Sequence, residues 1–288
     1  MLSDGKKKNY VDLHLHSTYS DGTFTIKEIV EYASTKKLAA VALTDHDCIS
    51  GIREITELAA RIDLEVVPGV EISSMYENID VHVLGYYFDL DNANLISKLE
   101  ELRQIRFERA KKIVDRLNSR GIALRFERVL EFSKGFSIGR PHIAAALLAE
   151  EYVSSYSEAF DKFVGNHTEF YIPVQKLTPH GAIQLIREAG GLAVLAHPAV
   201  LDDDNLVESL IKDGLDGLEV YYPKLPFKTF RAYRQLCHKY NLLETGGSDC
   251  HGPYFDEILI GSVHVPCGVL EKMKKRKSAL AQTTLPLA

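Results

Sequence analysis

Two histidines stand two residues apart near the start of the chain, in the stretch HLHSTYSDG that runs from His14 to Gly22. The stretch follows a short apolar run with strand character, and residues two apart on a strand point to the same side. Two neutral imidazoles side by side suit a divalent metal of intermediate softness. Taken alone, His14 and His16 are equally compatible with ordinary packing histidines, so the metal hypothesis needs further ligands elsewhere in the chain.

Most of the other candidate ligands occur at one structural position, the carboxyl end of an apolar run with strand character. His46 occurs in LTDHD, Glu71 in PGVEIS and His197 in LAHP. The motif GGSDCHG adds Asp249 and His251. In a β/α barrel, the carboxyl ends of the strands form the single face on which active sites are built. We therefore interpret these residues as parts of one site.

His82 departs from this pattern because it begins its apolar run, VHVLGYYF, instead of following it. It reaches the same face if the segment 81–88 runs antiparallel after a tight return from Glu71. With His82 and with Asp21 of the opening motif, the set holds six of the eleven histidines and three carboxylates. So many ligand-type residues on one face predict a metal site.

The elements that must position these residues alternate between strand and helix patterns. The expected strands lie at 11–16, 39–47, 64–73, 81–88, 191–198, 216–223 and 242–252. Such alternation indicates parallel β/α units. Seven strand candidates predict an α/β fold, an open or distorted barrel instead of a full eight-fold one.

The region from about 96 to 174 interrupts this alternation with helical patterns. Its first part has apolar residues at a period near 3.6 and is predicted to end at Gly121 as a helix C-cap. Shorter helical pieces follow around 126–132, 141–149 and 155–163. We predict a barrel formed by residues 1–95 and 175–288, with a helical insertion domain at 96–174 on its loop face.

The composition is that of a globular protein, with 45% apolar and 26% charged residues. The apolar runs are too short to cross a bilayer, and no signal peptide is evident. The four cysteines form no CxxC pair, which favours reduced thiols and a cytoplasmic location. We expect no membrane association and no obligate protein partner.

Charge is unevenly distributed along the chain, whose net charge is −6. The segment from Lys98 to Arg140 holds twelve Lys and Arg against six Asp and Glu, which leaves −12 on the remainder. A locally basic segment can steer anions toward one place. A solvated amphipathic helix explains the same charges without any such function.

Taken together, the motifs resemble the PHP (polymerase and histidinol phosphatase) family. HLHSTYSDG, TDHD, PGVEIS, the His82 strand, AHP and SDCHG occur in the order of that family, from Tyr10 to about Gly268. The resemblance implies a distorted (β/α)7 barrel with a di- or trinuclear metal site. The insert, with GRPHIA and then FYIPVQK, resembles the branch that hydrolyses 3′,5′-nucleoside bisphosphates to nucleoside 5′-phosphates; some members trim short RNA from its 5′ end.

The resemblance also implies how the ligands are shared among two to three divalent ions. The first ion would take His14, His16, Glu71 and Asp249, the second would share Glu71 and add His82 and His197, and the third would take Asp21, His46 and His251. Mixed imidazole and carboxylate ligation suits Mn²⁺, Fe²⁺ and Zn²⁺. We expect Mn²⁺ first, because oxygen ligands and phosphate are prominent.

The expected chemistry is phosphoester hydrolysis. Three ions bring +6 and three carboxylates return −3, so about +3 remains for a hydroxide and a phosphate monoester. We expect direct attack by a metal-bridging hydroxide, with a catalytic core of His14, His16, Glu71, His197 and Asp249. Arg140 is expected to hold the other phosphate of a nucleotide or short RNA substrate. His142 is a candidate for the same task or for protonating the leaving group.

Two other functions remain open. Histidinol-phosphate phosphatase belongs to the same family but is not associated with the GRPHIA insert, and an amine substrate gains nothing from a basic insert. A non-catalytic nucleotide-sensing module would be expected to lose ligands, whereas the set here is complete. Asp12 and Asp45 neighbour the ligands and serve either to orient them or in a plain structural role.

Overall fold

The computed structural model describes residues 8–77, 79–134, 136–173, 177–201, 203–253 and 259–283. Within these residues, one sheet runs in the order β7-β6-β5-β4-β3-β2-β1-β8. The strands are β1 (Tyr10–Leu15), β2 (Ala40–Leu43), β3 (Glu65–Tyr76), β4 (Ile79–Tyr86), β5 (Leu192–Leu195), β6 (Gly217–Tyr221), β7 (Leu243–Gly246) and β8 (Val265–Pro266).

The direction of the strands matches a distorted barrel. β1, β2 and β3 are parallel neighbours, as are β5, β6 and β7, whereas β4 runs antiparallel to both β3 and β5. The sheet nearly closes where the Asp249 N–H donates to the His14 carbonyl at 2.9 Å and the His16 N–H to that of Cys250 at 3.1 Å. The seven expected strands and the reversed fourth strand are confirmed. β8, a two-residue strand antiparallel to β1, was not expected.

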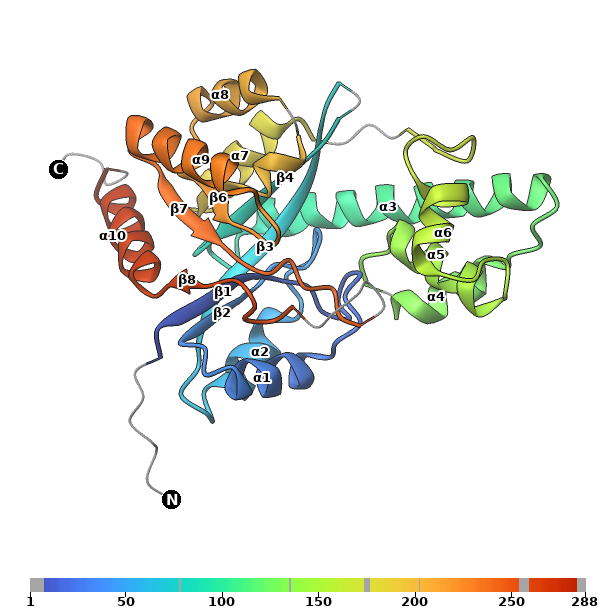
Figure 1. Cartoon of the computed structure of the whole chain (residues 1–288), viewed down its shortest axis with the longest axis horizontal. Coiled ribbons are helices and arrows are strands. Elements are labelled where there is room, and N and C mark those ends of the chain that lie inside the picture. Colours follow the sequence, from blue (N-terminus) through green and yellow to red (C-terminus); the bar gives the residue numbers. More distant parts are fainter. Residues whose placement is uncertain are drawn as a thin grey trace.

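Helices surround the barrel and extend to one side of it (Figure 1). Those that follow barrel strands are α1 (Ile26–Thr35), α2 (Ile52–Ala59), α7 (Pro179–Glu188), α8 (Asp204–Lys212), α9 (Phe227–Tyr240) and α10 (Gly268–Thr283). A short 3-10 helix, η2 (Pro198–Val200), follows β5. The inserted region contains α3 (Ala93–Ser119), α4 (Phe126–Ser133), α5 (Arg140–Ala149), α6 (Tyr156–Ala159) and the π-helical turn η1 (Phe160–Val164).

The long helix α3 belongs to two hydrophobic cores. The Asn92 side chain caps its start by accepting the Leu95 N–H at 2.9 Å, and Gly121, with φ +87°, lies just past its end. Its first turns, including Leu99, pack into the barrel cluster, whereas Leu117 packs into a cluster made by the inserted helices. The predicted boundary at residue 96 therefore falls inside a continuous helix, and the boundary at 174 lies outside the described residues. The domain division stays a prediction.

Replacing Ile143, which is fully buried on α5 in the cluster of inserted helices, tests this division. We expect Ile143→Ala to cost about 2–5 kcal/mol of local stability because it leaves a cavity. If the insert has a core of its own, hydrogen exchange measured by mass spectrometry should accelerate in α4, α5 and the second half of α3 only. Ile55→Ala, equally buried beneath the barrel, should spare those helices. Acceleration throughout the chain in both variants would contradict a separate insert.

Candidate metal centre

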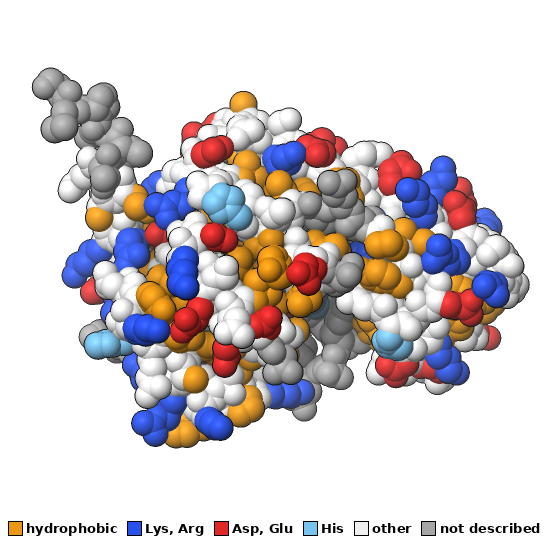
Figure 2. Space-filling model, turned by 90° about the horizontal axis from the view of Figure 1, so that it is seen from above, with side chains coloured by type: hydrophobic (Ala, Val, Ile, Leu, Met, Phe, Trp, Pro, Cys, Tyr) orange, Lys and Arg blue, Asp and Glu red, His pale blue; other side chains and the backbone are white. Residues whose placement is uncertain are grey.

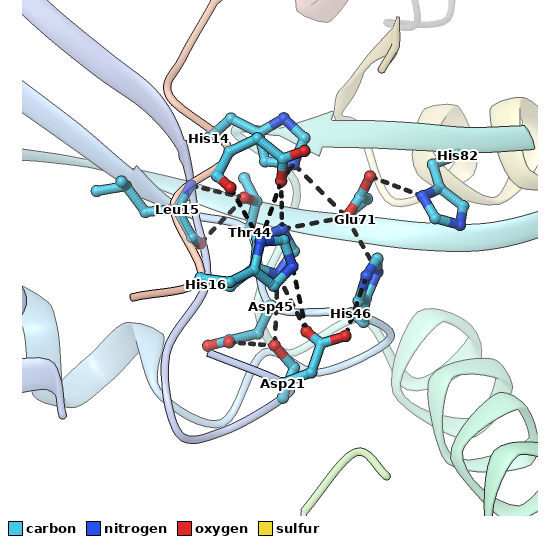
Figure 3. A network of polar contacts seen from close by, with 12 residues as sticks. His14, Leu15, His16, Asp21, Thr44, Asp45, His46, Glu71 and His82 are labelled. Atoms are coloured by element: carbon cyan, nitrogen blue, oxygen red, sulfur yellow. Dashed lines mark hydrogen bonds and ion pairs between the residues drawn. The ribbon is translucent and has the colours of Figure 1, made fainter. Parts of the chain in front are cut away.

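Glu71 on β3 lies at the centre of a cluster of histidine rings (Figure 3). Its Oε2 lies 3.5 Å from His14 Nε2, 3.2 Å from His16 Nε2 and 3.0 Å from His46 Nδ1. The other oxygen, Oε1, lies 3.0 Å from His82 Nδ1. One carboxylate thus faces rings from β1, from the loop after β2 and from β4.

A fifth ring reaches Glu71 from the end of β5, the strand beyond β4. His197, which follows β5, places Nε2 3.1 Å from Glu71 Oε1. The antiparallel course of β4 opposite β3 brings His82 to the same oxygen, because His82 pairs with Ser73 in the register of the two strands. The two oxygens of Glu71 therefore face two different sets of imidazoles, as a bridging carboxylate must.

Two more carboxylates flank the same histidines. Asp249 Oδ1 lies 3.3 Å from both His14 Nε2 and His16 Nε2. Asp21 lies 3.6 Å from His46 Nε2 and 3.5 Å from His251 Nε2. All nine ligand candidates thus lie around one rim. Three groups have donor atoms within 4.8 Å of one another: His16, Asp21, His46 and His251; His14, His16 and Asp249; and His46, Glu71 and His82.

The donor atoms fit divalent ions. Six nitrogen and oxygen atoms of the ligand candidates are buried without a hydrogen bond to any residue in the described part of the chain: His14 Nε2, His16 Nε2, Asp21 Oδ1, His46 Nδ1, Glu71 Oε2 and His197 Nδ1. Leaving such an atom unsatisfied costs about 1–3 kcal/mol, which a bound cation would offset. Donors about 2.1 Å from one ion lie about 3.0–3.4 Å apart in tetrahedral or octahedral geometry. The separations measured around Glu71 fall close to that range.

Electrostatics also favour cation binding at this cluster. Burial, reinforced by nearby Arg106, lowers the pKa of His46 to about 4 despite the pull of Asp21 and Glu71. The His46 imidazole is therefore neutral at pH 7, with a lone pair to offer. Burial would raise the pKa of Glu71, but His46, His82 and His14 hold it well below the ordinary value, so this carboxyl stays charged.

Asp45 and Asp12 hold the loops that carry ligands. Asp45 Oδ1 accepts hydrogen bonds from the Ser17 N–H at 2.8 Å and from the Ser20 hydroxyl at 2.6 Å, in the turn that leads to Asp21. Asp12 Oδ1 accepts the Ser248 N–H at 2.8 Å, beside Asp249. Both carboxylates bond the main chain near a ligand, and these contacts favour a role in orienting the ligands.

Sequence reasoning missed two residues that contact the ligands directly. Glu219 on β6 is buried, and its Oε1 lies 2.9 Å from His14 Nδ1. Tyr222, just after β6, donates its hydroxyl proton to Asp249 Oδ2 at 2.9 Å. The available signal for Glu219 was an acidic residue inside the otherwise apolar strand LEVY. Tyr222 gave no comparable signal.

A pocket of about 210 Å³ joins this cluster to the insert. Its lining includes Asp21, His46, His82 and His251 on the metal side and Arg106, Arg109 and Arg140 on α3 and α5. In the space-filling view the insert forms a separate lobe whose visible face carries both basic and acidic side chains (Figure 2). Within the basic segment, the three arginines that line the pocket are therefore better candidates for substrate contacts than the exposed basic residues of the lobe.

The three arginines differ in their partners. Arg106 Nε donates to Asp47 Oδ2 at 2.6 Å, and Arg140 Nη2 lies 3.5 Å from Asp80 Oδ2. Arg109, only 8% exposed, donates Nε–H to the Ile172 carbonyl, but its Nη2 has no hydrogen-bond partner among the described residues. Burial, with Arg140 nearby, lowers the pKa of Arg109 to about 10. It remains a cation at neutral pH.

His142 lies apart from this pocket, against Ser20. Its Nδ1 accepts the Gly139 N–H at 2.9 Å, so its Nε2 carries the proton and donates to the Ser20 carbonyl at 3.0 Å. Burial lowers the pKa of His142, which keeps the ring neutral. With both nitrogens engaged, these contacts favour a role in holding α5 against the loop before Asp21 over the phosphate contact or proton transfer expected from the sequence.

Comparison with known proteins agrees with this geometry. The sequence model of the PHP domain family matches residues 12–255. The chain belongs to the PHP domain family. Like its relatives, this PHP chain is a hydrolase that acts on phosphoester bonds, and its clusters of His, Asp and Glu fit divalent metals.

Three curated relatives of this PHP chain carry different substrate names. It is 32% identical over 247 residues to phosphoribosyl 1,2-cyclic phosphate 1,2-diphosphodiesterase of Eggerthella lenta, covering 84% of this chain and 94% of the relative. It is also 32% identical over 249 residues to 3′,5′-nucleoside bisphosphate phosphatase of Chromobacterium violaceum, with 84% and 87% covered. The 5′-3′ exoribonuclease Rnm of Escherichia coli is 30% identical over 259 residues, with 88% of each covered.

Solved structures resemble the whole PHP chain. A protein from Bifidobacterium adolescentis assigned as a metal-dependent phosphoesterase superposes with a TM-score of 0.86 at 33% identity, covering 92% of this chain and 96% of that one. An amidohydrolase from Chromobacterium violaceum with bound sulfate and no metal gives 0.84 at 28% identity, covering 93% and 96%. Among the described residues, no helix has the length and apolar character needed to span a membrane.

Proposed function

We propose that this chain removes the 3′-phosphate from 3′,5′-nucleoside bisphosphates, such as 3′,5′-adenosine bisphosphate, and leaves nucleoside 5′-phosphates. The observation that carries the proposal is one pocket lined on one side by the metal-ligand cluster and on the other by three arginines. A bisphosphate has an anionic group for each side. Trimming of short RNA from its 5′ end would place the same two phosphates in the same way, which accords with the relatives named exoribonucleases.

The nine ligands are proposed to hold two to three divalent ions. We propose Mn²⁺ as their identity, with Fe²⁺ and Zn²⁺ as alternatives. Bound ions of this kind lower the pKa of water toward about 7 and so supply hydroxide near neutral pH. The contacts of Glu71 support a bridging position, with Oε2 facing His14 and His16 and Oε1 facing His82 and His197. His46 faces both Glu71 and Asp21, and we place it with Asp21 and His251 on the third ion.

The catalytic core proposed for the scissile phosphate is His14, His16, Glu71, His197 and Asp249. In this core, Tyr222 keeps the Asp249 carboxylate oriented, because its hydroxyl occupies Oδ2 while Oδ1 faces the two rings of β1. Thus the protein fixes the donor atoms before any substrate arrives, which is the positioning that phosphoryl transfer chiefly requires.

The arginines would hold the phosphate that is not cleaved. A buried cation is costly unless an anion compensates it, and the free Nη2 of Arg109 provides a donor for a phosphate oxygen. Arg140, held near Asp80, can turn to the same phosphate with its planar fork of donors. Histidinol phosphate, with an amine in place of the second phosphate, would leave the Nη2 of Arg109 without an acceptor.

A phosphorylated nucleotide is thus the partner we propose, in the cytoplasm, and no protein partner is needed by this site. Among the described residues, the four cysteines form no disulfide. This location remains a prediction.

A substrate panel tests the assignment. The protein, loaded with Mn²⁺, is assayed for phosphate release from 3′,5′-adenosine bisphosphate and histidinol phosphate, for mononucleotide release from a 5′-phosphorylated oligoribonucleotide, and for ring opening of phosphoribosyl 1,2-cyclic phosphate. We expect the bisphosphate to be the best substrate, its activity lost in His14→Ala. Turnover of histidinol phosphate without nucleotide activity, or a clear preference for the cyclic ester, would reject the proposal. Tight nucleotide binding without any turnover would indicate a sensor.

A further inference from the structure

Glu219 on β6 is a buried carboxylate that lies behind the metal-ligand candidates. It is 1% exposed, and each of its oxygens contacts a different ligand-bearing residue. We propose that Glu219 is a positioning residue that fixes His14 through its ring and His197 through its main chain, and thereby sets the affinity of the site for divalent ions. The inference rests on the metal site of the proposed function, but not on the identity of the substrate.

The contact with His14 determines which ring nitrogen is free to bind a metal. Glu219 Oε1 lies 2.9 Å from His14 Nδ1. A charged carboxylate can only accept hydrogen bonds, so Nδ1 must carry the proton. In the neutral ring, Nε2 then has the lone pair, and this atom faces Glu71 Oε2 at 3.5 Å and Asp249 Oδ1 at 3.3 Å. Carboxylates that hold the distal N–H of a ligand histidine fix its tautomer and orientation in this way.

The contact with His197 acts on the backbone instead of the ring. Glu219 Oε2 accepts the His197 N–H at 2.7 Å. His197 has φ 28° and ψ 56°, in the left-handed region that a residue with a side chain adopts only when its surroundings hold it there. This conformation directs His197 Nε2 to within 3.1 Å of Glu71 Oε1. The same carboxylate thus supports ligands on both sides of the Glu71 bridge.

The two contacts explain why glutamine could not replace Glu219. Both oxygens of Glu219 accept from N–H groups, whereas a glutamine side chain has one accepting oxygen and one donating NH₂. In Glu219→Gln, either His14 changes its tautomer or the His197 N–H loses its acceptor. Loss of such a supporting contact weakens metal binding by about 10–100-fold in other metal sites. We expect a loss of this size for Mn²⁺.

The test compares Mn²⁺ binding to the full chain carrying Glu219→Gln with binding to the Glu244→Gln control. Glu244 lies on the neighbouring strand β7 and accepts a hydrogen bond from Arg234, away from the ligands. Free Mn²⁺ is followed by electron paramagnetic resonance, and the tautomer of His14 by ¹⁵N NMR of the protein loaded with diamagnetic Zn²⁺. We expect weaker binding only in Glu219→Gln, with an altered His14 signal when the glutamine oxygen keeps the His197 contact and an unchanged one when it keeps the His14 contact. At saturating Mn²⁺, activity should recover substantially with KM within about twofold of wild type, since the substrate pocket is untouched.

Different outcomes separate this inference from the metal site itself. Wild-type Mn²⁺ affinity and an unchanged His14 signal in Glu219→Gln would overturn it. If His14→Ala also binds Mn²⁺ normally, the proposed metal site is wrong, and the role given to Glu219 is wrong as well. Should Glu219→Gln not fold, Glu219→Asp keeps the charge but withdraws both oxygens by one methylene; wild-type affinity in that variant would equally overturn the inference.

Discussion

Replacement of Glu71 by glutamine is expected to lower kcat/KM for 3′,5′-adenosine bisphosphate by at least about a thousand-fold. The substitution preserves shape but removes the charge of the one carboxylate that faces five imidazoles, among them His46 and His82. A glutamine NH₂ would also place a donor where the rings need an acceptor or an ion. The measurement is steady-state phosphate release with Mn²⁺, together with the metal content of the purified variant.

The matched control for this prediction is Glu65→Gln at the start of the same strand. Glu65 pairs with Lys274 at 2.7 Å on the outer side of the barrel, so its loss should leave activity and metal content within about twofold of wild type. Retention of more than about a tenth of the activity by Glu71→Gln, with normal metal content, would contradict the bridging position given to this residue.

Arg109→Met is expected to raise KM for a bisphosphate by about 10–150-fold, the equivalent of about 1.5–3 kcal/mol for a hydrogen bond to a charged group. Methionine keeps the apolar stem of the side chain but removes the guanidinium, whose Nη2 has no partner within the described chain. An aryl phosphate has no second phosphate, so its KM should hardly change. Arg140→Ala should show the same contrast, although its pairing with Asp80 makes the effect smaller.

Arg120→Ala serves as the control for the arginine variants. Arg120 lies at the end of α3, where it is exposed and paired with Glu169. Its replacement by alanine removes the same charge from the insert without changing the pocket. If Arg120→Ala raises KM for the bisphosphate as much as Arg109→Met does, the insert acts through its net charge. If Arg109→Met raises KM equally for the bisphosphate and the aryl phosphate, the proposed contact between Arg109 and the second phosphate is wrong.

The sequence alone determined the class of the fold and which ligand candidates would lie near one another. Strand and helix periods alternate along the chain, and the carboxyl ends of parallel strands must meet at one face, so ligand-type residues at those ends are predicted to converge. The placement of His46, Glu71, His197 and Asp249 around one rim follows from this rule without any knowledge of individual contacts. Even the reversed course of β4 could be deduced, because only that course brings His82 to Glu71.

Only the tertiary structure decided the register of β1 against its neighbour, which the periods and spacings of the sequence do not encode. Between Asp12 and Leu15 the register of β1 shifts against β2, so Leu13 packs inside the barrel while Leu15 packs toward α1 and α2, and the simple alternation assumed for this strand is broken. Such an irregularity depends on the neighbouring strand, not on local sequence.

The supporting residues were likewise decided by contacts between distant parts of the chain. His14 and Glu219 are separated by 205 positions but meet at 2.9 Å, and Arg109 gains its importance from a pocket shared with the barrel. His142 has the residue type of a catalytic group, yet the main chain around Ser20 and Gly139 occupies both of its nitrogens. The sequence shows which side chains could do chemistry; hydrogen-bond partners set by the fold decide which of them are free to do it.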